Sequence, residues 1–400
     1  MPGYNRRVDL LRGSPTRRID EVRERLAREG RDVILLSTGQ PGVPPPAWLR
    51  GWLAERLLEE GMGLYSYTPS QGRLGLREAI ASDLAELDGV EVEPGQVVVT
   101  AGGQEAMYSV LRVVLEPGDK VVVLDPMYFG YWPLLEYLGA EPVVVETGPG
   151  FEVDPDTLAG VIVESRPKAV ILVDPDNPTG RVLGVEAVRA AAEAAVEADA
   201  WLIVDEAYRT LVYEGGRVPA YRYAPDNTIG IGTFSKDPGI PGWRLGYVYA
   251  PRWLAEKVKL VSEEVVYCPP SIAQEMVSEY LSRRRLRREW MLHLQNVYRE
   301  RRDALLDSLS KLLPEATPSK PRGGMFALVD LTPYLERAGI GSEELAERLL
   351  VEESVATVPG TFFGRRSRGS LRISFAAEPP ERIREGVERL ASLLERLQAL

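Results

Sequence analysis

The chain has 400 residues, of which 44% are hydrophobic, and carries a formal net charge of −11 at pH 7. This length and composition support a large hydrophobic core in two domains, while the negative charge argues against nucleic acid as the main partner. We find no signal peptide and no apolar run that could span a bilayer. The single cysteine, Cys268, excludes a disulfide framework and a cysteine-based metal site. We therefore expect a cytoplasmic protein without membrane contact.

The N-terminal part alternates charged helical patterns with loops rich in glycine and proline. The patterns predict helices at residues 19–30, 48–60 and 74–87. An apolar run at 33–36 leads into Ser37-Thr38-Gly39-Gln40-Pro41-Gly42, and Tyr65-Ser66-Tyr67-Thr68-Pro69-Ser70-Gln71-Gly72 precedes the third helix. Taken alone, the first of these loops is an ordinary connection between a strand and a turn.

Residues 97–232 alternate short apolar runs with helical patterns. The runs predict strands at 97–100, 120–124, 142–145, 169–173, 202–205 and 228–232. Short β-rich runs separated by helices are typical of βαβ units, so we predict an α/β fold with a mostly parallel sheet flanked by helices. Ligands of such sheets bind where the C-terminal ends of the strands meet, and the unusual stretches of this chain all follow strand ends.

The C-terminal part begins with helical patterns at 251–266 and 271–313. The second contains Arg283-Arg284-Arg285 and Arg287-Arg288, which we interpret as an ion-paired helix face rather than a nucleic-acid surface. From Arg322 onward, short strands and helices indicate a smaller α+β domain that the N-terminal segment completes. We therefore predict a large domain at 47–285 and a small domain formed by 1–46 and 286–400, including an N-terminal arm.

One of the few lysines lies in an unusual setting. Lys236 stands in Thr233-Phe234-Ser235-Lys236-Asp237-Pro238-Gly239, with a loop of Pro and Gly after it and Arg244 eight positions later. An amine whose surroundings lower its pKa can attack a carbonyl. The neighbouring hydroxyls and the arginine could hold a phosphate, so the stretch suggests a Schiff base to a phosphorylated aldehyde.

Two further stretches follow strands and carry candidate binding groups. Gly102-Gly103-Gln104 opens a helix, where free backbone N–H groups and the helix dipole favour a phosphate, although a plain tight turn fits the same pattern. Asp205 ends an apolar strand, and a buried carboxylate needs a partner. A metal is disfavoured as that partner, because the chain has one histidine, His293, and no acidic cluster beside Asp205.

Three other side chains have both a structural and a functional interpretation. Arg372 lies in the apolar strand Leu371-Arg372-Ile373-Ser374-Phe375, where its charge calls for a bidentate anion or for a structural pair with an aspartate. Asn177, in Asp176-Asn177-Pro178-Thr179-Gly180, is a turn former or a side-chain donor. Tyr128 is a core aromatic or a ring that stacks on a ligand.

In their order along the chain, these motifs resemble the aspartate aminotransferase superfamily, the fold-type I enzymes that use pyridoxal 5′-phosphate (PLP). The resemblance extends from Ile19 to the final helix, and the collinear order is more specific than any single motif. It implies that Lys236 holds PLP as a Schiff base. The residues implied in the phosphate cup are Gly102, Gly103, Gln104, Thr233, Ser235 and Arg244.

The same resemblance assigns roles around the cofactor ring. Asp205 would pair with the protonated pyridine nitrogen and keep the ring an electron sink. Tyr208 and Asn177 would donate to the phenolic oxygen of the cofactor, and Tyr128 would stack on its ring. The implied catalytic residues are therefore Lys236, Asp205 and Tyr208.

The resemblance also implies a substrate site and a partner. Gly39 would lie beside the substrate carboxylate, Arg372 would bind the α-carboxylate, and Asn177 would contact the substrate as well. Tyr67 would reach the phosphate bound by a neighbouring subunit, which implies a homodimer with shared active sites. The alternative is that Tyr67 packs on its own domain.

The predicted function is a PLP-dependent transfer of an amino group from an L-amino acid to a 2-oxo acid, with 2-oxoglutarate as the expected acceptor, by a ping-pong mechanism. Lys236 would act first as a general base and then as an acid. A PLP-dependent lyase or cyclase is the alternative, because Ser-Lys-Asp and Pro-Gly-Trp-Arg also resemble 1-aminocyclopropane-carboxylate synthases. A Rossmann-type nucleotide-binding enzyme and a non-catalytic protein of the PLP fold are more distant alternatives.

The sequence leaves the substrate side chain open. A dicarboxylate would need a second cation near its distal carboxylate, whereas an aromatic or aliphatic side chain would need an apolar wall. Candidates for the cation include Arg12, Arg17 and Arg73, and candidates for the wall are Tyr65, Phe129 and Trp243.

Overall fold

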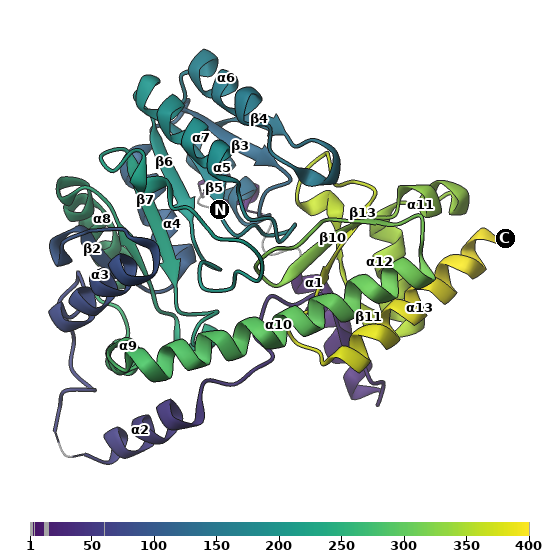
Figure 1. Ribbon diagram of the computed structural model, residues 1–400, viewed down its shortest axis with the longest axis horizontal. Helices are drawn as coiled ribbons and strands as arrows, with labels where there is room; N and C mark the ends of the chain where they lie inside the picture. The colour runs from purple at the N-terminus through teal and green to yellow at the C-terminus, as the bar shows by residue number, and fades with distance from the viewer. Residues whose placement is uncertain (1–2, 4, 12–15, 60, 400) are drawn as a thin grey trace.

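The computed structural model describes every residue except 1–2, 4, 12–15, 60 and 400. Its largest sheet contains β2 (Val97–Thr100), β3 (Lys120–Asp125), β4 (Glu141–Glu146), β5 (Ala169–Val173), β6 (Trp201–Asp205), β7 (Thr228–Thr233) and β8 (Gly246–Tyr249). These seven strands lie in the order β2-β8-β7-β6-β5-β3-β4, and every pair is parallel except those that β8 makes with β2 and β7 (Figure 1). The predicted α/β fold with a mostly parallel sheet is confirmed.

Both faces of this sheet are covered by helices. The helices are α3 (Leu74–Asp88), α4 (Gly103–Val114), α5 (Tyr131–Leu138), α6 (Pro155–Ser165), α7 (Val185–Glu197), α8 (Arg252–Val266) and α9 (Ser271–Ser282). Along β3, Val121 and Val123 pack with α4, α5 and α8, whereas Val122 and Leu124 pack with α6 and α7. Successive side chains of a strand point to opposite faces, so burying both faces requires the continuous apolar runs of the sequence.

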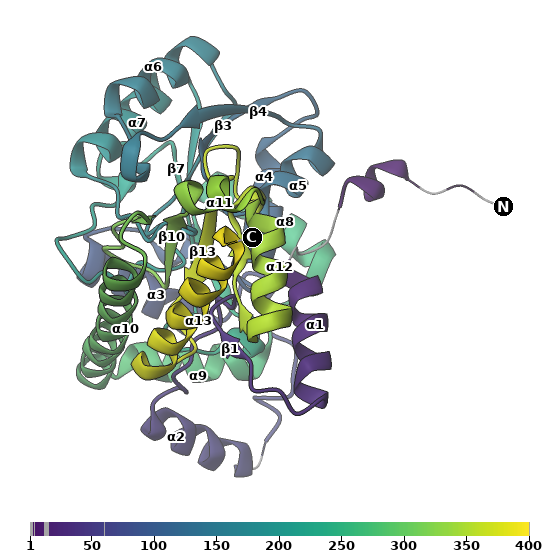
Figure 2. The same cartoon turned by 90° about the vertical axis from the view of Figure 1, so that its right-hand side faces the viewer.

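A smaller antiparallel sheet organises the C-terminal part. Its order is β12 (Val358–Pro359), β13 (Ser370–Ser374), β10 (Phe326–Asp330) and β9 (Thr317–Pro318). The helices of this part are α10 (Arg284–Leu312), α11 (Thr332–Ala338), α12 (Ser342–Glu353) and α13 (Pro380–Gln398). The N-terminal segment completes it as expected, because β1 (Ile34–Leu35) pairs in parallel with β11 (Val355–Ala356) and α1 (Thr16–Arg28) lies beside α12 (Figure 2).

One helix, α2 (Ala47–Leu58), projects from the body at the lower left of Figure 1. The short 3-10 helices are η1 (Arg6–Leu10), η2 (Pro94–Gln96), η3 (Pro149–Phe151), η4 (Ala220–Arg222), η5 (Pro241–Trp243) and η6 (Gly360–Phe362). Within the described part of the chain, no helix combines the length and the apolar character that crossing a bilayer would require.

Two features differ from the expectations. Strand β8 was not predicted, and the helical pattern at 271–313 is divided into α9 and α10 at Arg283. The predicted domain boundary at 285/286 falls in the first turn of α10, which continues from the large sheet to the small one (Figure 1). The division into domains therefore stays a prediction.

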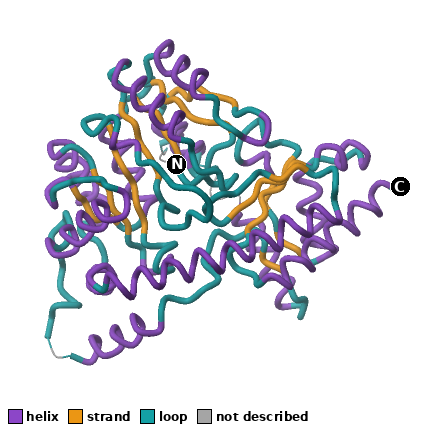
Figure 3. The backbone as a smooth tube through the Cα atoms, in the orientation of Figure 1, coloured by secondary structure: helices purple, strands orange, loops and turns teal. Residues whose placement is uncertain are grey.

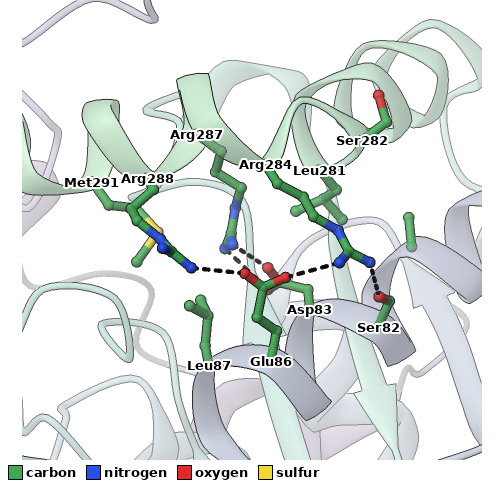
Figure 4. A pocket seen from close by; sticks show the side chains of 11 residues that line it. Ser82, Asp83, Glu86, Leu87, Leu281, Ser282, Arg284, Arg287, Arg288 and Met291 are labelled. Atoms are coloured by element: carbon green, nitrogen blue, oxygen red, sulfur yellow. Dashed lines mark hydrogen bonds and ion pairs between the residues drawn. The ribbon is translucent and has the colours of Figure 1, made fainter.

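The arginine-rich start of α10 is ion-paired, as interpreted from the sequence. Each of the five arginines at 283–285 and 287–288 has a carboxylate partner. Arg284 and Arg288 converge on Glu86 of α3, while Arg287 reaches Asp83 beside it (Figure 4). Arg287 is buried rather than solvated, so this contact joins α10 to the core of the large sheet.

A buried ionic network continues from this contact towards the ends of the central strands. Arg209 binds both Asp83 and Asp88 of α3. Arg217 lies 3.1 Å from Asp88 and also binds Glu206, which directly follows β6. Charges buried in this way need their partners, because removing one leaves the others desolvated and unpaired.

We predict that Arg209→Met lowers the free energy of unfolding by about 3–5 kcal/mol, because Asp83 and Asp88 lose a buried cationic partner. Chemical denaturation followed by circular dichroism measures this loss. Arg252→Met is the matched control, since Arg252 meets Glu93 at the surface at 3.7 Å and exposed pairs contribute about 0–1 kcal/mol. Equal stability of the two variants would contradict the structural role of the network.

Candidate active site

A cavity of about 330 Å³ lies at the C-terminal ends of the parallel strands, where it also reaches β13 of the smaller sheet. Loops that leave the strands converge in the region between the two sheets (Figure 3). This edge is where ligands of α/β sheets bind. The predicted site residues that line the cavity are Gly39, Gly103, Gln104, Tyr128, Asn177, Asp205, Tyr208, Thr233, Ser235, Lys236, Arg244 and Arg372.

Lys236 follows β7 and lines this cavity with its amine. The Nζ atom donates to the carbonyl oxygen of Gly39 at 2.7 Å and lies 5.7 Å from the centre of the Tyr208 ring. The pKa of Lys236 is lowered to about 8, first by burial and then by the charge of Arg372, against the opposing effect of Asp205. A lysine with this pKa keeps part of its amine unprotonated near neutrality, as a nucleophile requires.

Asp205 ends β6 and has two hydrogen bonds that orient its carboxylate. One oxygen accepts the backbone N–H of Ala207 at 3.0 Å, and the other accepts the hydroxyl of Tyr131. Burial raises the pKa of Asp205, while both hydrogen bonds and the charge of Lys236 act in the opposite direction. The carboxylate is therefore held in place but is poorly solvated, and it suits a cationic partner.

Tyr131, which was not predicted as a site residue, hydrogen-bonds Asp205 from the first turn of α5. Tyrosine in an apolar helix looks like a core residue, and the ring of Tyr131 does pack edge-on against Tyr128 at 5.1 Å. The available signal was the spacing of three residues between the two tyrosines, which a turn before α5 brings close together, with the N–H of Tyr131 donating to the carbonyl of Tyr128 at 3.1 Å. The contact of Tyr131 with Asp205 depends on tertiary packing.

Tyr208 and Asn177, the two predicted hydrogen-bond donors, both line the cavity. Burial raises the pKa of Tyr208, so its phenol stays protonated and can donate. The amide oxygen of Asn177 accepts from Arg372 at 3.1 Å, and the Asn177 side chain is also hydrogen-bonded to Tyr208, which partly opposes the rise in the pKa of that phenol. Their donation to a cofactor and the stacking of Tyr128 stay predictions.

Arg372 occupies the middle of β13 and is 2% exposed. Its Nη atoms donate to Asn177 and, at 2.6 Å, to the carbonyl of Ser37, while its Nε has no hydrogen-bond partner. The guanidinium carbon lies 4.3 Å from the centre of the Phe326 ring. Among the described residues, no carboxylate lies within ion-pair distance of Arg372, so this cation is available to an anionic ligand.

The start of α4 and the segment after β7 lie side by side at the cavity, and we call this arrangement the cradle. Gly102 caps α4 without a side-chain hydrogen bond, which leaves backbone N–H groups of the first turn free to bind an anion. Gly102 has a φ of +92°, which residues with a side chain rarely adopt, and this conformation explains the glycine. The Thr233 hydroxyl donates to Ser235 at 2.9 Å, so both hydroxyls lie beside this cradle.

These groups fit PLP. The partly deprotonated amine of Lys236 suits an aldehyde, the buried carboxylate of Asp205 suits a protonated ring nitrogen, and the α4 N-terminus with Arg244 suits a phosphate. The unpartnered Nε of Arg372 suits the carboxylate of a substrate. A ligand of this kind would pair charges that are costly to bury alone.

Some predicted residues lie away from the cavity. Tyr67 does not line it: its side chain is 82% exposed, and its ring lies 5.1 Å from that of Tyr267. Of the three candidates for an apolar wall, Phe129 lines the cavity, whereas Tyr65 and Trp243 do not. Gly102 contributes through its backbone as the cap of α4.

The N-terminal helix supplies cavity residues that the sequence did not indicate. Thr16 and Asp20 of α1 line the cavity opposite the strand ends, and Phe326 joins them from β10. Nothing in the local pattern of α1 distinguishes these positions from a solvated helix face. Within the described ranges, no three His, Cys, Asp or Glu side chains are grouped so as to hold a metal ion.

Comparison with known proteins identifies relatives along the whole chain. A family model described as "Aminotransferase class I and II" matches residues 31–390. The aspartate/prephenate aminotransferase of Thermus thermophilus is 35% identical over 400 residues, which cover 99% of this chain and 100% of the relative. The arginine–pyruvate transaminase of Pseudomonas aeruginosa is 33% identical over 369 residues, with 91% and 90% covered.

Solved structures give the same result. The Thermus thermophilus aspartate aminotransferase with maleate matches with a TM-score of 0.91 and 34% identity, covering 98% of this chain and 100% of that chain. The relatives agree on amino-group transfer, but their names differ in the side chain of the substrate.

We predict that Lys236 in the cofactor-free protein reacts with a small aldehyde with a pH midpoint of about 8. Below that pH the amine is protonated and unreactive, and above it the free amine attacks. Reductive methylation at a series of pH values, followed by peptide mapping, measures the midpoint. Arg372→Met should move the midpoint upward because it removes a nearby positive charge, and a midpoint near the ordinary lysine value of 10.5 in both proteins would refute the proposed environment.

Proposed function

The chain belongs to the class I and II aminotransferases, which makes it a PLP-dependent transaminase, and on that premise we propose how its residues perform the reaction. An L-amino acid would give its amino group to the enzyme, and a 2-oxo acid would then take it in a second half-reaction at the same site. 2-Oxoglutarate is the acceptor that the sequence resemblance implies. This two-step exchange is a ping-pong mechanism.

The observation that carries this proposal is the buried guanidinium of Arg372 beside the amine of Lys236. Arg372 lies close enough to lower the pKa of Lys236, yet among the described residues it has no carboxylate partner. An amino acid whose α-carboxylate binds Arg372 would bring its own amino group and Cα towards Lys236. The α-carboxylate of the substrate would thus lie at Arg372, and its reacting amino group and Cα would lie near Lys236.

When bound, PLP supplies an electron sink that acidifies the Cα–H bond of the substrate. Lys236 would hold the cofactor before the reaction and, once displaced by the substrate amine, would take the proton from Cα and return it at C4′ of the cofactor. Its lowered pKa suits both steps, because the amine can accept and release a proton near neutrality.

The other residues would hold the cofactor in a reactive state. Asp205, oriented by Tyr131 and Ala207, would keep the ring nitrogen protonated. Tyr208 and Asn177 would donate to the phenolic oxygen. The cradle at the start of α4 would bind the phosphate and prevent the cofactor from leaving when Lys236 is displaced.

We also propose a homodimer with shared active sites. The end of α2 and the segment after it expose several apolar side chains, among them Leu58 at 86%, Met62 at 68% and Tyr67 at 82%. Such patches mark interaction surfaces, and α2 itself projects from the body (Figure 1). Tyr67 does not line the cavity of its own chain, which supports a role at the phosphate of a partner subunit. The cytoplasmic location expected from the single cysteine remains part of this proposal.

We predict that the protein loaded with PLP shows a visible band that bleaches with an L-amino acid and returns with a 2-oxo acid. Lys236→Ala should lose turnover by at least about 10³-fold while keeping its circular dichroism spectrum, because it removes the group that transfers the proton. Bleaching that never reverses, with release of ammonia, would favour a lyase or cyclase instead. Full activity of Lys236→Ala would refute the assignment.

Tyr67→Phe should weaken retention of PLP, because it removes a donor to the phosphate of the partner subunit. Equilibrium dialysis measures this affinity, and Tyr65→Phe, in the same exposed loop, is the matched control. Mixed dimers of Lys236→Ala and Tyr67→Phe should regain activity at limiting PLP, since one of their two sites has both side chains intact. A monomeric protein with unchanged affinity for PLP would contradict the shared site.

A further inference from the structure

Resting on the aminotransferase function proposed above, we infer that the amino-acid donor has an uncharged apolar or aromatic side chain. This side chain would enter an apolar pocket beside Phe129, and the described residues of its own protomer would offer it no second cation. The inference follows from the charges that line the cavity and from the character of the pocket next to it.

The charged side chains that line the cavity are Asp20, Asp205, Lys236, Arg244 and Arg372. Each cation among them has a task in the reaction: Lys236 attaches the cofactor, Arg244 serves the phosphate, and Arg372 serves the α-carboxylate. Within the part of the protomer that the structure describes, no cation of the cavity remains for a second carboxylate. A dicarboxylate would therefore lose hydration at its distal end without gaining a charged partner.

The arginines considered from the sequence do not change this balance. Arg17 pairs with Glu21 at 3.1 Å on the exposed side of α1, and Arg73 lies 4.0 Å from Glu275. Neither arginine lines the cavity. Arg12 lies outside the described residues.

A second pocket of about 260 Å³ adjoins the cavity and is lined mainly by apolar side chains. Leu11 forms one wall, and Pro133 and Leu134 of α5 form another, with Phe129 shared between the pocket and the cavity. The ring of Phe129 lies 5.8 Å from the guanidinium of Arg372. A substrate whose α-carboxylate binds Arg372 therefore has this apolar pocket within reach of its side chain.

Asp20 adds a negative charge at the rim of the cavity. Its side chain is 50% exposed and lies 3.7 Å from Arg23 of the same helix. This partly solvated carboxylate disfavours a second carboxylate on the substrate. Water and Arg23 already compensate the charge of Asp20, so Asp20 favours a cationic substrate side chain only weakly. The preference of the apolar pocket for an uncharged side chain is stronger.

The same charge balance applies to the second half-reaction, since both substrates use one site. A monocarboxylic 2-oxo acid should therefore be a better acceptor than 2-oxoglutarate, which would revise the acceptor implied by the sequence resemblance.

The first test measures single-turnover bleaching of the PLP enzyme with phenylalanine, leucine, aspartate and arginine. We expect the apparent second-order rate constant for phenylalanine to exceed those for aspartate and arginine at least tenfold. A higher value for aspartate or arginine overturns this inference but leaves the aminotransferase function intact. If no amino acid bleaches the band, it is the proposed function that fails.

A binding measurement removes the dependence on activity. Calorimetric titration of the PLP enzyme with 3-phenylpropionate and with maleate compares an aromatic monocarboxylate with a dicarboxylate, and neither compound has an amino group to transfer. We expect 3-phenylpropionate to bind at least tenfold more tightly. Equal or tighter binding of maleate would show that a cation serves the distal end, for example one supplied by a partner subunit.

The pocket itself is tested by Leu11→Glu, which places a charge in its wall. The ratio of kcat/KM for phenylalanine to that for alanine should fall at least tenfold, because the alanine side chain is too short to enter the pocket. Val8→Glu is the matched control: Val8 is 48% exposed in η1 and does not line the pocket, so the ratio should stay the same. An unchanged ratio in Leu11→Glu overturns the assignment of the pocket.

Discussion

Burying two cations in one cavity is the constraint on which the active site depends. Arg372 helps to lower the pKa of Lys236 to about 8, and burial lowers the pKa of Arg372 itself to about 10. Asp205 offsets part of this charge from within the chain. The positive charge that Asp205 does not offset favours the binding of anionic ligands. The same electrostatic effects that lower the pKa of the lysine therefore also favour a phosphate and a carboxylate.

The ionic network behind the cavity explains how this arrangement is held rigid. Glu206, the residue after Asp205, binds Arg217, and Asp237, the residue after Lys236, lies 3.8 Å from Arg287 and accepts the hydroxyl of Tyr280. Asp205 and Lys236 are thus each held in place by the ion pairs and hydrogen bonds of the residue that follows them in the chain. Because the network also joins α3 to α10, it connects the cavity to the helix that leads towards the smaller sheet.

Much of the fold could be predicted, because burying both faces of a parallel sheet requires the apolar runs that mark its strands. Strand β8 escaped prediction, since its four residues follow a loop whose glycines and arginine pointed to a ligand. Its first residue, Gly246, is needed because a Cβ there would lie 2.8 Å from the backbone of Gly102. No pattern in the sequence around Gly246 or Gly102 indicates that the two segments approach each other. The contact between Tyr131 and Asp205 is likewise not indicated by the sequence around either residue.

The sequence by itself determined the class of fold, and local chemical signals indicated a lysine among hydroxyls, an acid at a strand end and an arginine in an apolar strand. The roles of Gly39, Tyr128 and Tyr208 came only from the family resemblance. The tertiary structure alone decided which groups meet. It left Arg372 without a carboxylate partner among the described residues, brought Asp20 of α1 to the rim, and placed an apolar pocket beside Phe129. The net charge of the cavity and its shape depend on segments that are distant in the chain, so neither can be predicted from a single stretch of sequence.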